Sequence, residues 1–313
     1  MQVSIGDIVT ARRRIADCVS ETPLLADDGL GGALFKLECW QRTGSFKVRG
    51  AFNRLKALSP AERAQGVIAA SSGNHAQGVA LAARTLGIDA LLVMSDQVPP
   101  VKVAAVRRLG AQVVLRGRDF DDAVAGADAL CAETGRTMVH AFADSFCIAG
   151  QGTVGLEIAA AAPETALVAV PAGGGGLAVG CAVALKALLP TVRVVGVQSE
   201  ASTHLATSFR AGRPVPVRHL PTIAEGLYGD TTPEMVDLAL RHLDDVIVVS
   251  EEAIADALRY LFHAHRIVAE GSGAVAVAAL REGLLPLRAT VAIVSGRNVE
   301  PELFRRLVLD PKA

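Results

Sequence analysis

The chain alternates short runs of β-branched and aliphatic residues with longer Ala-rich stretches in which apolar positions recur at helical spacing. The short runs are typical of buried strands, and the longer stretches are typical of amphipathic helices. We predict strands over residues 66–70, 90–94, 111–115, 137–140, 166–170, 192–197, 245–249 and 290–294. We predict helices over residues 75–86, 101–109, 121–134, 152–161, 177–189, 251–265 and 273–281.

Glycine follows several of the predicted helices at the position where a helix commonly ends. Gly87, Gly110 and Gly135 each come directly after the last periodic residue, and glycine adopts the left-handed conformation needed there without strain. Repetition of strand, helix and strand favours parallel sheets joined by right-handed crossovers. Residues 212–233 form a Pro- and Gly-rich stretch longer than most connections, which we expect to be functional or mobile.

The composition supports an α/β protein of about two domains. Of the 313 residues, 51% are hydrophobic but only 4% aromatic, a mixture that suits helix-covered parallel strands. The formal net charge is −1, with no basic stripe, so nucleic acid and anionic membranes are poor candidate partners. No signal core or membrane-length apolar stretch is found, and the five cysteines lack metal-ligand spacing. We therefore expect a soluble cytoplasmic protein with reduced thiols.

A lysine stands at the predicted start of a helix within TGSFKVRGA, residues 43–51. Ser45 is a suitable N-cap, since its hydroxyl can accept a bond from a free backbone N–H. Lys47 then falls in the first turn, where the positive end of the helix dipole lowers the pKa of an amine. A neutral amine is the nucleophile that imine formation requires. Spacing alone leaves open whether Lys47 is this nucleophile or an ordinary solvated lysine.

A second motif, SSGNHAQG, joins a predicted strand to a predicted helix at residues 71–78. Hydroxyl groups and free backbone N–H groups at a helix start can hold a carboxylate or phosphate, and Asn74 adds an amide donor. The motif is equally compatible with a capped helix start in which Gly73 makes the turn.

Consecutive glycines, Gly173, Gly174, Gly175 and Gly176, separate another predicted strand from the helix that begins near Leu177. Such a run is conformationally costly, and it allows backbone N–H groups to approach a phosphate closely. No Lys-Ser/Thr pair follows, and the spacing is not that of a dinucleotide-binding turn. A cofactor with a single phosphate fits this loop best, and a generic tight loop is the alternative.

Together these motifs resemble the serine/threonine dehydratase and serine racemase family, which are pyridoxal-phosphate (PLP) enzymes of fold type II, like the tryptophan synthase β-subunit. The resemblance covers nearly the whole chain. It rests on KLECWQRTGSFKVRGA (36–51), SSGNHAQG (71–78), AGQGTVGLE (149–157), GGGGL (173–177), VQSE (197–200), EGSGA (270–274) and SGRNVE (295–300).

The resemblance implies a role for each matching residue. It makes Lys47 the lysine that carries the cofactor as a Schiff base, with Phe46 packing beside the cofactor ring. Asn74 would bond the phenolic oxygen, and Ser295 would face the pyridine nitrogen. The remaining matches are Gly173, Gly174, Gly175, Gly176 and Leu177 for the phosphate, Gly226 and Glu270 for the cofactor pocket, and Ser71, Ser72, Asn74 and His75 for the substrate carboxylate.

The same resemblance implies a lyase that deaminates a hydroxy amino acid, by default L-threonine or L-serine, to a 2-oxo acid and ammonia. The neutral hydroxyl of Ser295 stabilises a protonated pyridinium less than a carboxylate would. It therefore favours β-elimination, in which departure of the β-hydroxyl quickly removes negative charge from the α-carbon. Lys47 would take the α-proton.

Ser72 stands where many dehydratases of the family carry alanine and racemases carry serine. Racemisation needs an acid–base group on each face of the cofactor. Ser72 opposite Lys47 therefore makes a serine or aspartate racemase the first alternative function. The competing interpretation is a serine that only caps the helix.

Two further departures bear on metal and substrate. Glu200 matches one ligand of a divalent-cation site (Mg²⁺, Ca²⁺ or Mn²⁺) found in serine racemases and some dehydratases. Its expected partner falls near Ala206, whose side chain cannot ligate, so the site is incomplete. Arg297 stands where members of the family commonly carry glycine. Its side chain faces either a second group on the substrate or the solvent. Hydroxyaspartate, phenylserine and compatible-solute breakdown products therefore stay beside threonine and serine as candidate substrates.

The resemblance implies two open, parallel-rich twisted sheets flanked by helices, with the cofactor in the interdomain cleft. We expect residues 60–143 to form a small mobile domain, inserted into a large PLP-binding domain made of residues 1–59 and 144–313. No C-terminal regulatory domain is expected, and a homodimer is. Two more functions stay open: a cysteine-synthase-type transferase, against which SFKVRG argues, and a cofactor-binding protein without turnover.

Overall fold

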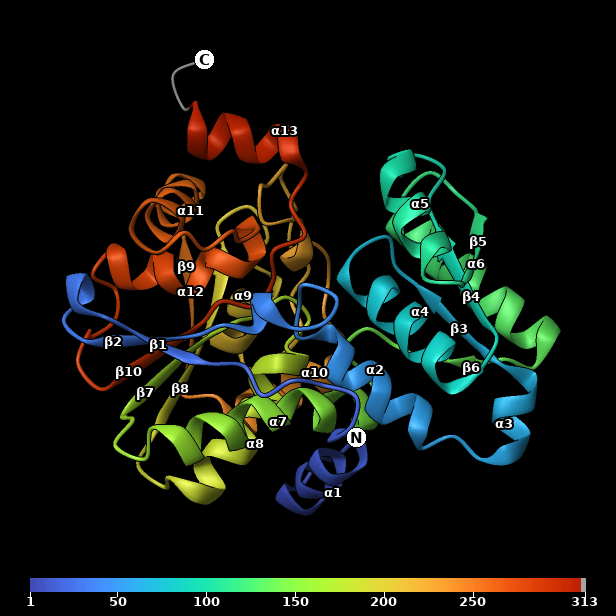
Figure 1. The fold of residues 1–313 in the computed structure, drawn as a ribbon, viewed down its shortest axis with the longest axis horizontal. Helices are drawn as coiled ribbons and strands as arrows, with labels where there is room; N and C mark the ends of the chain where they lie inside the picture. Colours follow the sequence, from blue (N-terminus) through green and yellow to red (C-terminus); the bar gives the residue numbers. More distant parts are fainter. Residues whose placement is uncertain (311–313) are drawn as a thin grey trace.

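The computed structural model describes residues 1–310, and its strands form two sheets (Figure 1). The larger sheet has six strands in the order β1-β2-β10-β7-β8-β9, with the β1–β2 pair antiparallel and the other pairs parallel. The smaller sheet has four parallel strands in the order β5-β4-β3-β6. The strands are β1 (Leu24–Asp27), β2 (Ala33–Lys36), β3 (Val67–Ala70), β4 (Ala90–Met94), β5 (Gln112–Leu115), β6 (Thr137–Met138), β7 (Leu167–Pro171), β8 (Arg193–Ser199), β9 (Asp245–Val249) and β10 (Thr290–Ile293).

Helices cover both faces of the six-stranded sheet. Helices α11 and α12 lie on one face, and α1, α7 and α8 lie on the other, each group with its own hydrophobic core (Figure 1). The helices are α1 (Ile5–Ile15), α2 (Lys47–Lys56), α3 (Pro60–Gln65), α4 (Asn74–Leu86), α5 (Pro100–Arg108), α6 (Phe120–Thr134), α7 (Ser145–Ala161), α8 (Gly176–Leu188), α9 (His204–Ala211), α10 (Pro233–His242), α11 (Glu251–His265), α12 (Gly271–Arg281) and α13 (Pro301–Phe304). Short helical turns are η1 (Asp28–Leu30), η2 (Glu38–Trp40), η3 (Glu225–Leu227) and η4 (Arg305–Leu309).

The predicted α/β class is confirmed, and most predicted elements are present within a residue or two of their bounds. Strands over 90–94 and 245–249 and the helix over 251–265 match the structure at both ends. Gly87, Gly110 and Gly135 adopt positive φ after helices, as predicted. The irregular stretch ends at Pro233, where α10 begins, and contains the single turn η3.

Helix α7 begins at Ser145, seven residues before the predicted start. The sequence there is rich in glycine, which disfavours helix in isolation. The structure shows why glycine is needed: an added Cβ at Gly150 would lie 2.6 Å from the Arg49 carbonyl oxygen, and one at Gly152 would lie 2.8 Å from the Gly180 carbonyl oxygen. Close backbone packing between helices therefore outweighs local helix propensity at these positions.

The strand predicted over 137–140 is also shorter than expected, because β6 ends at Met138. The reason is a turn made by the next residues. The His140 ring Nδ1 accepts hydrogen bonds from the backbone N–H groups of Phe142 at 3.2 Å and Ala143 at 2.9 Å. This turn directs the chain from the smaller sheet toward α7.

Helix α2 is anchored by a buried ionic network. Arg49, which is fully buried, donates to Glu38 Oε2 at 2.8 Å and to Glu157 Oε1 at 2.6 Å. Lys36 Nζ donates to the other oxygen of Glu157 at 2.6 Å. Buried charges are tolerated only when they are paired in this way. The network ties the first turn of α2, which contains Lys47, to the end of β2 and to α7.

Within residues 1–310, no helix combines the length and the apolar character that a bilayer crossing requires.

Candidate active site

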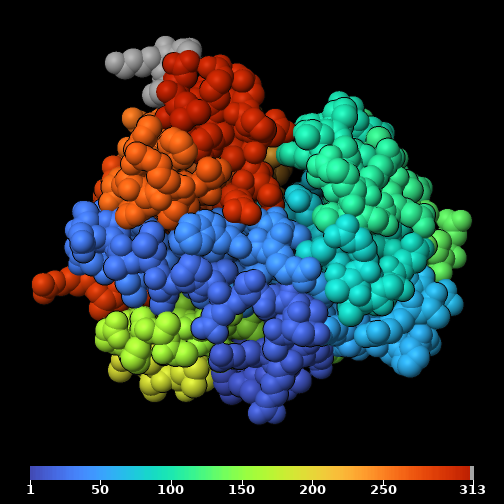
Figure 2. All heavy atoms as spheres, viewed as in Figure 1, coloured from blue at the N-terminus to red at the C-terminus, as the bar shows by residue number. Residues whose placement is uncertain are grey.

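A cavity of about 340 Å³ lies between the two sheets, at the ends of β3 and β7. Figure 2 shows the hollow between the teal lobe that carries α4 and α5 and the red C-terminal segment. All the residues assigned from the sequence to cofactor and substrate line it, namely Phe46, Lys47, Ser71, Ser72, Asn74, His75, Gly173, Gly174, Gly175, Gly176, Leu177, Gly226, Glu270 and Ser295. These residues come from separate parts of the chain, and the fold brings them to one place.

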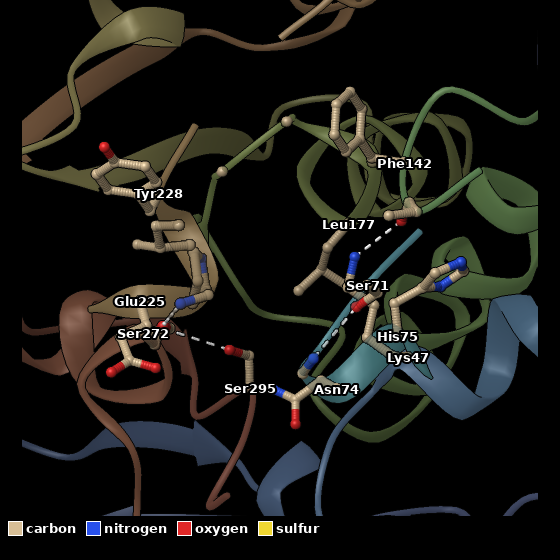
Figure 3. A pocket seen from close by; sticks show the side chains of 18 of the residues that line it. Lys47, Ser71, Asn74, His75, Phe142, Leu177, Glu225, Tyr228, Ser272 and Ser295 are labelled. Carbon is tan, nitrogen blue, oxygen red and sulfur yellow. Dashed lines mark hydrogen bonds between the residues drawn. The ribbon is translucent and has the colours of Figure 1, made fainter. Parts of the chain in front are cut away.

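Lys47 is the first residue of α2 and points into the cavity (Figure 3). Its Nζ donates a hydrogen bond of 2.8 Å to the carbonyl oxygen of Ala141 and lies 5.2 Å from the centre of the Phe46 ring. Burial lowers the pKa of the Lys47 amine to about 8. A substantial fraction of the amine is therefore neutral near pH 8, as a nucleophile or base must be.

The start of α2 differs from the prediction in one respect. The N-cap position belongs to Phe46, which makes no side-chain cap bond, while the Ser45 hydroxyl is buried and has no hydrogen-bond partner among the described residues. A backbone hydrogen bond holds the start of the helix instead of a side-chain cap: Phe46 N donates to Ser295 O at 3.2 Å. This bond links the lysine directly to the segment that carries Ser295.

The glycine loop lies between β7 and α8. Gly175 is the N-cap of α8, with a φ of 91° that side chains other than glycine rarely adopt. A Cβ added at Gly174 would collide with the Phe142 ring, and one at Gly173 would lie 3.2 Å from Leu227 Cα. The first N–H groups of a helix have no intrahelical partner and attract anions. The loop therefore presents backbone rather than side chains to the cavity, an arrangement that can hold an anion such as a phosphate.

A chain of polar contacts that includes Asn74 and Glu270 lines another part of the cavity wall. Asn74 Nδ2 donates to Glu270 Oε1 at 2.6 Å, and Asn298 Nδ2 donates to Asn74 Oδ1 at 2.6 Å. Burial raises the pKa of Glu270 to about 7. Ser295, which is buried, donates to the Ser272 carbonyl oxygen at 3.4 Å. The cavity thus offers a neutral hydroxyl at Ser295 and an oriented amide at Asn74.

The serines before α4 behave differently from each other. Ser71 Oγ accepts a bond of 3.2 Å from Gly73 N. The N-cap of α4 is Gly73, without a side-chain cap bond, so Ser72 does not serve as the predicted cap. Ser72 is one of the residues that line the cavity.

His75 contributes less than its position in the motif suggested. Its ring is buried, and Nε2 lies 2.8 Å from the carbonyl oxygen of Val139. Burial lowers the pKa of His75 to about 3, so the imidazole is neutral. What this residue can offer an anion is its backbone N–H in the first turn of α4.

Glu200 lies outside the cavity, and its Oε1 accepts the backbone N–H of Glu251 at 2.9 Å. At the expected partner position, Ala206 N donates to Gln198 Oε1 at 2.7 Å. Across residues 1–310, no cluster of three or more His, Cys, Asp or Glu side chains is arranged to hold a metal ion. Arg297 is exposed and does not line the cavity.

Several lining residues were not identified from the sequence. Lys102 Nζ, on α5, forms an ion pair with Glu225 Oε2 at 2.6 Å and so bridges the two sides of the cavity. Glu225 falls within the irregular stretch that was expected to be functional, whereas Lys102 sits on an ordinary amphipathic helix and gave no signal. The others are Ala70, Gly73, Gln77, Phe120, Ala141, Phe142, Pro171, Leu227, Tyr228, Asp230, Ser272 and Asn298.

Comparison with known proteins agrees with this geometry. Residues 15–296 match the family described as "Pyridoxal-phosphate dependent enzyme". The chain is 44% identical to the L-threonine ammonia-lyase of Thermotoga maritima, over 98% of this chain and 78% of that protein. It is 41% identical to the catabolic L-threonine dehydratase TdcB of Escherichia coli, over 96% of this chain and 94% of that protein.

Among solved structures, maize serine racemase superposes with a TM-score of 0.93 at 33% identity, covering 98% of this chain and 97% of that one. The processed form of threonine deaminase isoform 2 from Solanum lycopersicum superposes with a TM-score of 0.91 at 33% identity, covering 97% of this chain and 86% of that one.

Proposed function

The chain belongs to the family of pyridoxal-phosphate dependent enzymes, and on that premise we propose that it is an ammonia-lyase for L-threonine or L-serine. The reaction removes the β-hydroxyl as water and yields a 2-oxo acid and ammonia. The observation that carries the proposal is the convergence of Lys47, the glycine loop and Ser295 on one cavity. Relatives at 41–44% identity over nearly the full chain, named threonine ammonia-lyase and dehydratase, supply the substrate class.

The cavity fits the cofactor. A side chain at Gly174 would collide with Phe142, so the loop can present only backbone to a phosphate. Lys47 offers an amine whose pKa of about 8 suits covalent attachment. We propose Gly173, Gly174, Gly175, Gly176 and Leu177 for the phosphate, Asn74 for the phenolic oxygen, Ser295 for the ring nitrogen, and Phe46, Gly226 and Glu270 for the ring's surroundings.

When bound, PLP supplies an electron sink for the pair released from the substrate α-carbon. Lys47 is the base that removes the α-proton, and its buried setting keeps a neutral amine available for this task. The β-hydroxyl accepts a proton and leaves as water, and the released enamine hydrolyses to the 2-oxo acid and ammonia. The neutral hydroxyl of Ser295 leaves the ring nitrogen without a carboxylate partner, which favours rapid elimination over long-lived charge.

The substrate carboxylate is placed at the start of α4. Ser71, Ser72 and Asn74 line the cavity there, and the free N–H groups of the first turn, including that of His75, attract an anion. We propose that residues 60–143 form a small domain that closes over the bound substrate and excludes water. The ion pair of Lys102 with Glu225 across the cavity supports such a closed arrangement.

A second candidate function, serine or aspartate racemisation, is favoured by one observation. Ser72 lines the cavity and does not cap α4, which supports its hydroxyl as the acid–base group that racemisation needs on the face opposite Lys47. We propose racemisation as a minor activity beside elimination.

Family resemblance and composition support a proposal for the quaternary structure and for the cellular location. We propose a homodimer, which light scattering of the holoenzyme will test. We also propose a cytoplasmic location, because all five cysteines are free and reduced thiols persist in that compartment.

The deciding experiment is a substrate panel scored for 2-oxo acid, for ammonia and for the configuration of the remaining amino acid. With threonine or with serine, the enzyme should release one molecule of ammonia for each molecule of 2-oxo acid. Hydroxyaspartate and phenylserine test for a longer substrate. Turnover of O-acetylserine with sulfide, or absence of turnover with every hydroxy amino acid, would refute the lyase.

A further inference from the structure

The glycine loop rests on a group of polar side chains on the side away from the cavity. Thr231 Oγ1 donates a hydrogen bond of 3.1 Å to the carbonyl oxygen of Gly174, and Thr231 N donates one of 2.9 Å to His204 Nδ1. We propose that His204 and Thr231 are positioning residues, which aim the backbone N–H of Gly175 at the cofactor phosphate.

The geometry of the peptide group explains how this works. In a planar trans peptide, the carbonyl oxygen of one residue and the N–H of the next point in opposite directions. Thr231 holds the Gly174 carbonyl, so it fixes the orientation of the Gly175 N–H on the opposite side. Both glycines line the cavity. Glycine peptides otherwise rotate freely, and a loop without side chains cannot fix this orientation by its own packing.

The histidine contact is specific in its chemistry. A backbone N–H can only donate, so His204 Nδ1 must accept and therefore carries no proton. The proton of a neutral His204 ring is then on Nε2, which lies 3.7 Å from Asp230 Oδ1. His204 and Thr231 are both buried, so loss of either partner would leave an unsatisfied polar group away from water.

A second layer holds the first in place. His219 Nε2 lies 2.7 Å from Asp230 Oδ1, and His219 Nδ1 lies 3.0 Å from Ser202 Oγ. Ser202 Oγ also donates to the Leu227 carbonyl oxygen at 3.2 Å. These bonds join the start of α9 to the irregular stretch after it. The part of that stretch around Thr231 is therefore held against the glycine loop.

The inference rests on the cofactor alone and is independent of the proposed substrate. It is tested by binding two probes to the full-length apoprotein, PLP and pyridoxal. They share the aldehyde and the ring and differ in the phosphate. Apparent dissociation constants come from the absorbance of the lysine-bound form, and no turnover is required.

We expect Thr231→Val and His204→Leu each to raise the dissociation constant of PLP about tenfold, the effect of one well-placed hydrogen bond. The dissociation constant of pyridoxal should stay within about twofold of the wild-type value, because pyridoxal makes no phosphate contact. His204→Asn, which keeps an acceptor, should recover most of the affinity for PLP.

Thr165→Val is the matched control, because Thr165 is buried and its Oγ1 donates to the Ala162 carbonyl oxygen at 2.7 Å, outside the cavity. It should leave both dissociation constants unchanged. Equal weakening of PLP and pyridoxal by Thr231→Val would overturn the proposal, since it would reveal general damage to the cavity. An unchanged constant for PLP would overturn it too. If His204→Leu does not fold, Thr231→Val decides alone.

Discussion

Asn74 and Glu270 meet across the cavity through a hydrogen bond of 2.6 Å from Nδ2 to Oε1. Asn74 begins α4, beside the smaller sheet, whereas Glu270 is the N-cap of α12, against the larger one. Asn298 holds the other end of the amide by donating to Asn74 Oδ1 at 2.6 Å. The amide is thus oriented, and the second hydrogen of Nδ2 remains available for a ligand oxygen.

Glu270 should make the stability of the apoprotein depend on pH. Burial raises the pKa of its carboxyl from 4.5 to about 7, so the folded state releases this proton at a higher pH than the unfolded chain. The free energy of unfolding should therefore fall by roughly 1–3 kcal/mol as the pH rises from about 4.5 to about 7, the range expected for a partly exposed group. Above pH 7 it should level off.

Glu270→Gln removes the titration, and chemical unfolding between pH 5 and pH 8 should then show a flatter profile. Glu252→Gln is the control, because Glu252 is exposed and should leave the slope of the wild type unchanged. If the free energy of unfolding of Glu270→Gln depends on pH as steeply as that of the wild type, other groups cause the pH dependence.

Lys47 should attach the cofactor with a pH dependence set by its own amine. Burial lowers the pKa of Lys47 to about 8, and only the neutral amine attacks an aldehyde. The rate of covalent attachment of PLP to the apoprotein should rise with pH and level off just above 8. A rate that keeps rising to pH 10 would contradict this assignment.

Lys47→Ala should abolish both attachment and elimination, lowering kcat/KM by roughly 10³-fold or more. Non-covalent PLP binding through the glycine loop should persist. Lys186→Ala is the control, since Lys186 forms a surface ion pair with Asp244. Mass spectrometry after borohydride reduction locates the modified lysine.

Local signals in the sequence predicted the fold class, and the motifs together with the family resemblance predicted half of the residues that line the cavity. Hydrophobic runs report strands, and the glycine loop and the SSGNHAQG turn report backbone geometry at helix starts. Ser45 shows the limit of this reasoning. It suits an N-cap by type, but the bond from Phe46 N to Ser295 O sets the helix start, and this contact is invisible in the local sequence.

Residues whose role depends on distant partners were missed for the same reason. Lys102 acquires its role from Glu225, which lies far away in the chain. His204 belongs to no histidine pattern in the sequence, and only the fold places it against Thr231. The early part of α7 was missed because its glycines oppose helix locally and are explained by packing against other helices.

Gly174→Ala should weaken PLP binding because the new Cβ would collide with the Phe142 ring. We expect the dissociation constant of PLP to rise at least roughly tenfold, as overpacking typically costs 1–3 kcal/mol. Phe142→Ala in the same chain should recover part of the loss by making room. Gly6→Ala is the control, since its nearest new contact would be an ordinary 3.6 Å. Failure of the double variant to recover would show that the Phe142 ring is not the obstacle.

Metal chelation should leave activity unchanged. The Glu200 carboxylate accepts the backbone N–H of Glu251, and Ala206 offers no side-chain ligand. We therefore expect the holoenzyme to keep its kcat/KM after EDTA treatment and to gain nothing from added Mg²⁺, Ca²⁺ or Mn²⁺. A loss on chelation that one of these ions reverses would reveal a site built from other donors.

Ser72→Ala should separate elimination from racemisation. Elimination needs only the base on the Lys47 face, so the variant should keep 2-oxo acid formation from L-serine within about tenfold of the wild-type rate. Racemisation needs a proton donor on the opposite face, a role we propose for Ser72, which lines the cavity without capping α4. Any D-serine made by the wild type should therefore disappear.

Reaction in deuterium oxide sharpens this test. The proton that Lys47 removes from the α-carbon exchanges with the solvent, and return of a deuteron to the same face yields labelled L-serine. This exchange should continue in Ser72→Ala, whereas the formation of labelled D-serine should be lost. Ser71→Ala is the control, because the Ser71 hydroxyl accepts the Gly73 N–H. Its loss should change the KM for L-serine equally in elimination and in racemisation. Undiminished D-serine from Ser72→Ala would exclude Ser72 as the second acid–base group. D-serine formed as fast as 2-oxo acid by the wild type would instead make racemisation the main activity.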